Sequence, residues 1–68
     1  ANGTGSSLSS RQHEVLQLLA EGHAAKAIAS ILNISIKTVE YHKYRMMEQL
    51  KVKSTAELVQ YAVKNHIV

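Results

Sequence analysis

Turn signals divide this 68-residue chain into four short segments, and that division limits the possible fold more than any other feature. The signals are Gly22, the Asn-Ile-Ser stretch at residues 33–35, and Ser54. Each segment between them carries apolar residues at α-helical spacing, and none shows the alternation typical of a strand. Because so small a domain buries little surface, the helices must share one core. The sequence therefore predicts an all-α, compact four-helix bundle.

The first two predicted helices differ in how clearly they begin. Residues 8–21 form the first helix, with Ser9 as its N-cap and Gln12 completing a capping box. It ends at Gly22, which adopts a left-handed conformation without penalty. The second helix, residues 24–32, begins with alanines, which cannot accept a hydrogen bond from a free backbone N–H.

The third predicted helix spans residues 35–50 and is capped by Ser35. Its helical phase separates two sets of side chains. The inward set is Val39, His42, Met46 and Leu50. The outward set is Lys37, Glu40, Tyr41, Tyr44 and Glu48. We expect His42 to be a packed, hydrogen-bonded histidine at the edge of the core; the alternative is a phosphate contact.

The fourth predicted helix begins at Ser54, with Glu57 completing a second capping box, and frays over residues 65–68. Its apolar residues fall on two neighbouring lines, Leu58 with Ala62 and Val59 with Val63. The second line indicates a surface for another copy of the chain. The alternative is a broad core face in a small domain.

The excess positive charge lies on one part of the chain. Residues 35–53 hold five Lys or Arg against two Glu, and the rest is balanced at three against three, so this segment carries the whole net charge of +3. Such a basic segment is typical of a polyanion-binding surface, although a solvated lysine-rich face is the alternative. Two helices joined by a short turn, the second one basic, also outline a helix-turn-helix, whose second helix enters the major groove of DNA.

Other classes of function find no support. The chain has no Cys, its four His are scattered, and it lacks a nucleophile elbow or a glycine-rich phosphate loop. No apolar run approaches the roughly 18 residues of a membrane span. We therefore expect no enzyme activity, no metal or other cofactor, and no membrane partner. Because the chain begins with Ala, we expect a fragment of a longer protein, with residues 1–7 a flexible linker or an artificial remnant.

An ordered set of motifs carries a family resemblance. The segments LSSRQHEVLQLLAEG, KAIASILNIS, KTVEYH and LKVKSTAELVQYA resemble the LuxR-type (NarL/FixJ-type) helix-turn-helix DNA-binding domain of bacterial transcription regulators. The resemblance covers residues 8–68. It implies double-stranded DNA as the partner, a recognition helix at residues 35–50, and a homodimer through the fourth helix, at Val59 and Val63. It also implies a cytoplasmic protein of the response-regulator or quorum-sensing type, with a receiver or sensor domain upstream.

The resemblance assigns DNA contacts by position. The base-contact candidates are Glu40, Tyr41 and Tyr44. The phosphate-contact candidates are Lys26, Lys37, Thr38, Lys43, Arg45 and Lys51. Glu40 suits base reading because its carboxylate can accept a hydrogen bond from the cytosine N4 amino group and repels wrong acceptors. The alternative is that Glu40 only pairs with Lys37 or Lys43 at helical spacing, or with Tyr44.

Some positions depart from the family pattern. Gln12 stands where Glu is usual, and residues 24–27 read Ala-Ala-Lys-Ala where Ser/Thr-Asn-Lys-Glu is common, which costs the second helix a cap worth roughly 1 kcal/mol. Two alternatives remain open. One is region 4 of a sigma factor, which shares the helix-turn-helix, and the other is a helical protein-interaction module that does not bind DNA.

Overall fold

The computed structural model describes residues 8–66, so the predicted linker at residues 1–7 and the fraying predicted for residues 67 and 68 lie outside the described part. It contains α1 (Ser10–Ala20), α2 (Ala25–Leu32), α3 (Ile36–Leu50) and α4 (Thr55–Lys64). The described residues form no strand. The predicted all-α, four-helix architecture is confirmed, and each helix lies within two residues of its expected bounds where those were given.

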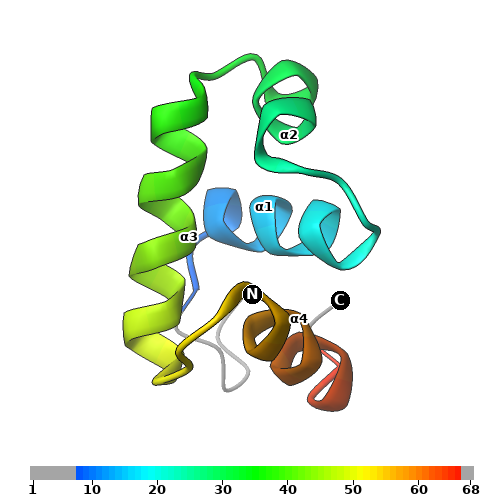
Figure 1. Cartoon of the computed structure of the whole chain (residues 1–68), viewed down its shortest axis with the longest axis vertical. Coiled ribbons are helices and arrows are strands. Elements are labelled where there is room, and N and C mark those ends of the chain that lie inside the picture. Colours follow the sequence, from blue (N-terminus) through cyan, green and yellow to red (C-terminus); the bar gives the residue numbers. More distant parts are fainter. Residues whose placement is uncertain (1–7, 67–68) are drawn as a thin grey trace.

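The longest helix, α3, forms one side of the molecule. In Figure 1 it runs vertically, and α2, α1 and α4 are stacked beside it from top to bottom. Each of these three helices packs against α3, and α1 also packs against α2 and α4. This arrangement leaves the opposite face of α3 uncovered by any other helix.

All four helices contribute to a single core, which carries Leu8 at its edge. The buried apolar side chains are Leu8, Val15, Leu16, Ile28, Ala29, Val39, Met46, Leu58 and Ala62. On α3, Val39 and Met46 are fully buried as predicted. The other two residues of the predicted inward set, His42 and Leu50, are only half-buried, because they lie at the edges of the packed face.

The predicted N-caps form, with one correction. The Ser9 hydroxyl accepts from the Gln12 backbone N–H and the Gln12 side chain accepts from Ser9, as a capping box requires. Ser54 caps α4 by accepting from the Glu57 N–H, but the Glu57 carboxylate binds the backbone N–H of Lys53 at 2.9 Å. The predicted second capping box is therefore wrong in its reciprocal bond, because the Glu57 carboxylate accepts from the N–H of the residue before the N-cap.

Left-handed residues end the first three helices. Gly22 has φ +100°, and Asn33 and Lys51 each have φ +59°. Asn33 opens the turn into Ser35, whose side chain accepts from the Thr38 backbone N–H at 3.0 Å. Asn33 therefore ends α2 and Ser35 begins α3, so residues of the turn itself form the helix-turn-helix.

Candidate nucleic-acid interface

The uncovered face of α3 carries four of the nine predicted DNA contacts. Tyr41 and Tyr44 are each 59% exposed, and Lys37 is exposed on the first turn. Glu40 lies at the edge of this face, with its side chain 35% exposed. Two aromatic rings, a lysine and a carboxylate therefore project from one surface of a single helix, immediately after the helix-turn-helix turn.

Three further predicted phosphate contacts are exposed on α2, on α3 and just after α3. Lys26 is exposed on α2, Lys51 is exposed just after the end of α3, and the Arg45 side chain is 54% exposed on α3. The Arg45 guanidinium lies 3.8 Å from Glu48 in an exposed pair, which holds it only weakly. The charged groups of these three side chains are therefore exposed to solvent, where a DNA phosphate can approach them.

Thr38 and Lys43 are less available than the other phosphate candidates. The Thr38 hydroxyl lies 2.8 Å from the Ser35 hydroxyl, at the N-terminus of α3. Lys43 Nζ lies 2.8 Å from Glu40 Oε1, so the predicted alternative of a Glu40–Lys43 pair is formed in the domain without DNA. Base contact by Glu40 stays a prediction, because a residue paired in the free domain can still face a base.

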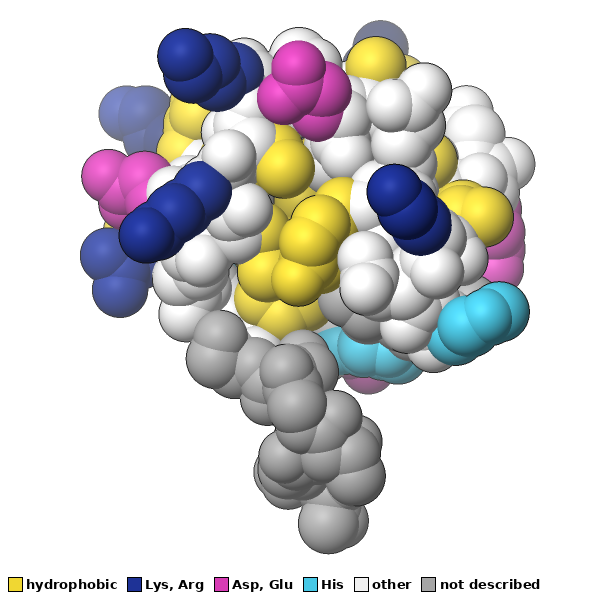
Figure 2. All heavy atoms as spheres, turned by 90° about the horizontal axis from the view of Figure 1, so that it is seen from below, with side chains coloured by type: hydrophobic (Ala, Val, Ile, Leu, Met, Phe, Trp, Pro, Cys, Tyr) yellow, Lys and Arg dark blue, Asp and Glu magenta, His cyan; other side chains and the backbone are white. Residues whose placement is uncertain are grey.

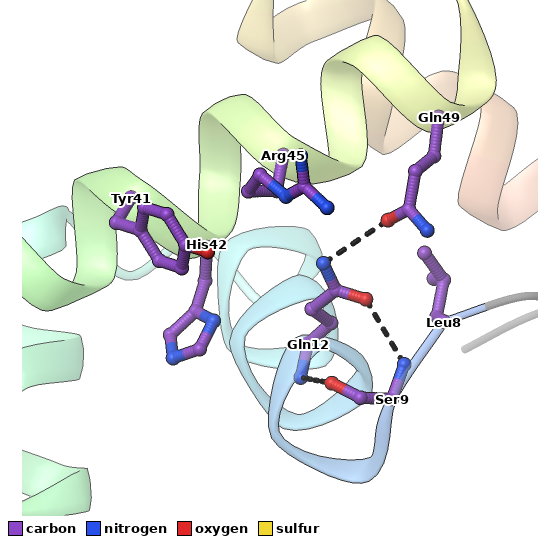
Figure 3. Close-up of a pocket in the computed structure, with 7 residues that line it drawn as sticks. All are labelled: Leu8, Ser9, Gln12, Tyr41, His42, Arg45 and Gln49. Atoms are coloured by element: carbon purple, nitrogen blue, oxygen red, sulfur yellow. Dashed lines mark hydrogen bonds between the residues drawn. The ribbon is translucent and has the colours of Figure 1, made fainter.

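A pocket of about 370 Å³ lies beside the uncovered face of α3, between α3 and the start of α1. Gln49 extends from α3 toward Gln12 of α1, which also bonds the N-cap Ser9, and His42 extends from α3 on the other side of Gln12 (Figure 3). The His42 ring meets Tyr41 edge-on, with ring centroids 5.6 Å apart. His42 is thus half-buried at the core edge, as the first of its two predicted roles requires, but among the described residues its side chain makes no hydrogen bond, so that part of the prediction is not met.

The sequence did not predict the side-chain hydrogen bond that joins α1 to α3. Gln12 Nε2 donates to Gln49 Oε1 at 3.0 Å, and Gln12 is only 8% exposed (Figure 3). The two residues are 37 positions apart, so no local pattern links them. The sequence offered only an indirect signal for this bond: the predicted capping box fixes the orientation of the Gln12 side chain, but it does not name a partner for its amide group.

The end of the molecule formed by α4 presents an apolar surface. Figure 2 looks at the molecule from the α4 end and shows hydrophobic side chains gathered in the middle of that face, with Lys and Arg side chains around them. Val63 is 57% exposed and Val59 is half-buried, whereas Leu58 and Ala62 are fully buried. Of the two predicted apolar lines on α4, one therefore enters the core and the other reaches solvent.

Neither a metal site nor a membrane helix is found in the described region. Within residues 8–66, no three His, Cys, Asp or Glu side chains are grouped to hold a metal ion. Among the same residues, no helix has both the length and the apolar character needed to cross a bilayer.

Comparisons with known proteins agree with this geometry. The family model GerE, described as bacterial regulatory proteins of the luxR family, matches residues 6–62. The chain is 48% identical over 61 residues to the oxygen regulatory protein NreC of Staphylococcus carnosus (strain TM300). It has the same identity to NreC proteins of Staphylococcus epidermidis and Staphylococcus aureus. Each match covers 90% of this chain and 28% of the relative, so the chain spans less than a third of these proteins.

Proposed function

This chain belongs to the luxR family of bacterial regulatory proteins and is a DNA-binding domain of a transcription regulator, and from that premise we propose that α3 reads double-stranded DNA in the major groove. The observation that carries the proposal is the uncovered face of α3, with Tyr41 and Tyr44 each 59% exposed beside Lys37. The major groove is wide enough for one helix and displays a distinct pattern for every base pair.

Affinity and selectivity come from different residues. Lys26, Lys37, Arg45 and Lys51 bind phosphates, aided by the Thr38 hydroxyl, and release counterions regardless of sequence. Glu40, Tyr41 and Tyr44 face the bases. The Glu40 carboxylate accepts from cytosine N4, and the tyrosine rings contact thymine methyl groups. Lys43 differs from the other cations because its ammonium group is bound to Glu40.

Selection of bound duplexes from a random pool tests this function. We expect an enriched sequence whose affinity exceeds that of random duplex at about 150 mM salt, with affinity falling as salt rises. Equal affinity for both duplexes would reject sequence-specific recognition, whereas no binding to either duplex would favour the interaction module that does not bind DNA. Repeating the selection with Glu40→Ala should relax one position that prefers cytosine, and an unchanged preference at every position would reject base contact by Glu40.

We further propose that the domain dimerises through the exposed apolar line of α4. Val63 is 57% exposed at the end of that line, and Val59 lies one turn before it. Val63→Asp should weaken binding to paired half-sites more than binding to one half-site. Gln60→Asp places the same charge on an exposed position beside the line and should have a smaller effect. Equal losses on paired and single half-sites for Val63→Asp would contradict the interface.

The relatives support a proposal for the whole protein. Because this chain covers only 28% of each NreC protein, we propose that it is the effector part of a longer, cytoplasmic regulator with a receiver or sensor domain. The luxR-family match includes most of α4, which favours this class over region 4 of a sigma factor. In the longer protein, the regulatory domain's signal should change affinity for the selected duplex, and an affinity independent of that domain would contradict the proposal.

A further inference from the structure

Lys43 is unlike every other cation of the domain. The chain has eight Lys and Arg, all within the described residues, and every one except Lys43 is exposed. The Lys43 side chain is only 17% exposed. A lysine that is meant to reach for phosphate usually keeps its flexible stem and ammonium group in water.

The Lys43 ammonium group contacts two predicted base-reading residues. Its Nζ lies 2.8 Å from Glu40 Oε1 and 5.3 Å from the centre of the Tyr44 ring. The pair with Glu40 is shorter than the Arg45–Glu48 pair at 3.8 Å, and its side chains are less exposed. A short pair that is partly shielded from water is held more firmly than an exposed one.

This geometry makes Lys43 a poor phosphate ligand. A phosphate bound to this ammonium group would compete with the Glu40 carboxylate for its charge and would lie close to that carboxylate, which repels it. Lys37, which is exposed on the same helix, has neither obstacle. Phosphate binding is therefore better supplied by Lys37 than by Lys43.

The same contacts suit Lys43 to a role in reading sequence. With Oε1 bound to Lys43, the second oxygen of Glu40 remains to accept a hydrogen bond from cytosine N4. The adjacent ammonium charge also reduces the repulsion between Glu40 and the phosphates. We propose that Lys43 is a positioning residue that fixes the Glu40 carboxylate and the Tyr44 ring for base contact and does not bind phosphate. This inference rests on the proposed function, in which α3 lies in the major groove and Glu40 meets a base.

Two lysine substitutions on the same helix separate the roles. Lys43→Met keeps an unbranched side chain but removes the ammonium group, and Lys37→Met makes the same change at an exposed site. For each, the measurements are binding-site selection and the slope of log affinity against log salt, with circular dichroism to confirm the fold. Lys43→Met should lower cytosine discrimination at the Glu40-dependent position about five-fold or more and leave the salt slope unchanged. Lys37→Met should reduce the slope by about 0.9 and keep the cytosine preference.

Three further results decide the inference. Glu40→Ala combined with Lys43→Met should discriminate no worse than Glu40→Ala alone, because Lys43 acts through Glu40. Lys43→Arg should retain the preference, since it keeps a cation beside the carboxylate. A salt slope that falls by about 0.9 in Lys43→Met with cytosine preference intact would overturn the proposal, and so would no change in either measurement.

The failure of this inference differs from the failure of the proposed function. If Glu40→Ala relaxes the cytosine position and Lys43→Met does not, DNA reading by Glu40 stands and positioning by Lys43 is rejected. If the unmodified domain selects no sequence at all, the proposed function itself is rejected.

Discussion

Replacing Gln12 with Ala should destabilise the domain far more than replacing Gln17, although both glutamines lie on α1. Gln12 is 8% exposed, and its side chain accepts from the Ser9 N–H at 2.9 Å and donates to Gln49 at 3.0 Å. Gln17 is exposed, and its amide lies 3.5 Å from a Glu21 oxygen. Of the two, only Gln12 bonds both the N-cap of α1 and a residue of α3.

The expected loss follows from what Gln12→Ala removes. The bond to Ser9 contributes about 1 kcal/mol, and the buried methylene about 0.8 kcal/mol. The bond to Gln49 adds a few tenths of a kcal/mol, because Gln49 is exposed and can bind water instead. The free energy of unfolding should therefore fall by about 2 kcal/mol. For a domain of this size, that lowers the melting temperature by roughly 8–16 °C.

Thermal and urea unfolding followed by circular dichroism at 222 nm would measure this effect. Gln17→Ala is the matched control and should stay within about 0.5 kcal/mol of the unmodified domain. If the two variants unfold together, the reasoning is wrong, and the buried capping box does not stabilise the fold.

Three other changes test the packing and the caps. Ala24→Ser should stabilise the domain by about 1 kcal/mol, because Ala24 has the extended N-cap conformation without a side-chain bond; an unchanged urea midpoint would contradict this. Met46→Ala should cost about 2–5 kcal/mol in urea unfolding, since Met46 is fully buried, and a loss below 1 kcal/mol would mean that the core collapses around the gap. Glu57→Ala should cost about 1 kcal/mol by releasing the Lys53 N–H, whereas no loss would show that water replaces the carboxylate.

The predictions that held concern contacts between residues three or four apart. Ser9 with Gln12 and Ser35 with Thr38 lie one helical turn apart, so their geometry follows from the helix itself. The phase of α3 likewise placed Val39 and Met46 in the core. Tertiary packing did not overturn these assignments, because each of them satisfies a local backbone group or a helical face.

Local spacing left other questions open, even within one helix. Lys37, Lys43 and Tyr44 all stood within reach of Glu40, and only the structure selects Lys43, whose side chain is largely covered and pairs with the carboxylate at 2.8 Å. The reciprocal bond of Glu57 was also predicted for the wrong N–H, since side-chain conformation decides between neighbouring donors.

By itself, the sequence determined four helices, their caps, a helix-turn-helix and a basic third helix, because these depend on residue type and short spacing. Only the tertiary structure decided that α1 is joined to α3 through Gln12 and Gln49, and that Val63 rather than Leu58 meets solvent. These features depend on how the helices cross, and the crossing is set by the packing of the whole core. The direction of the Lys43 ammonium group, on which the proposed positioning of Glu40 depends, is likewise decided by the tertiary structure.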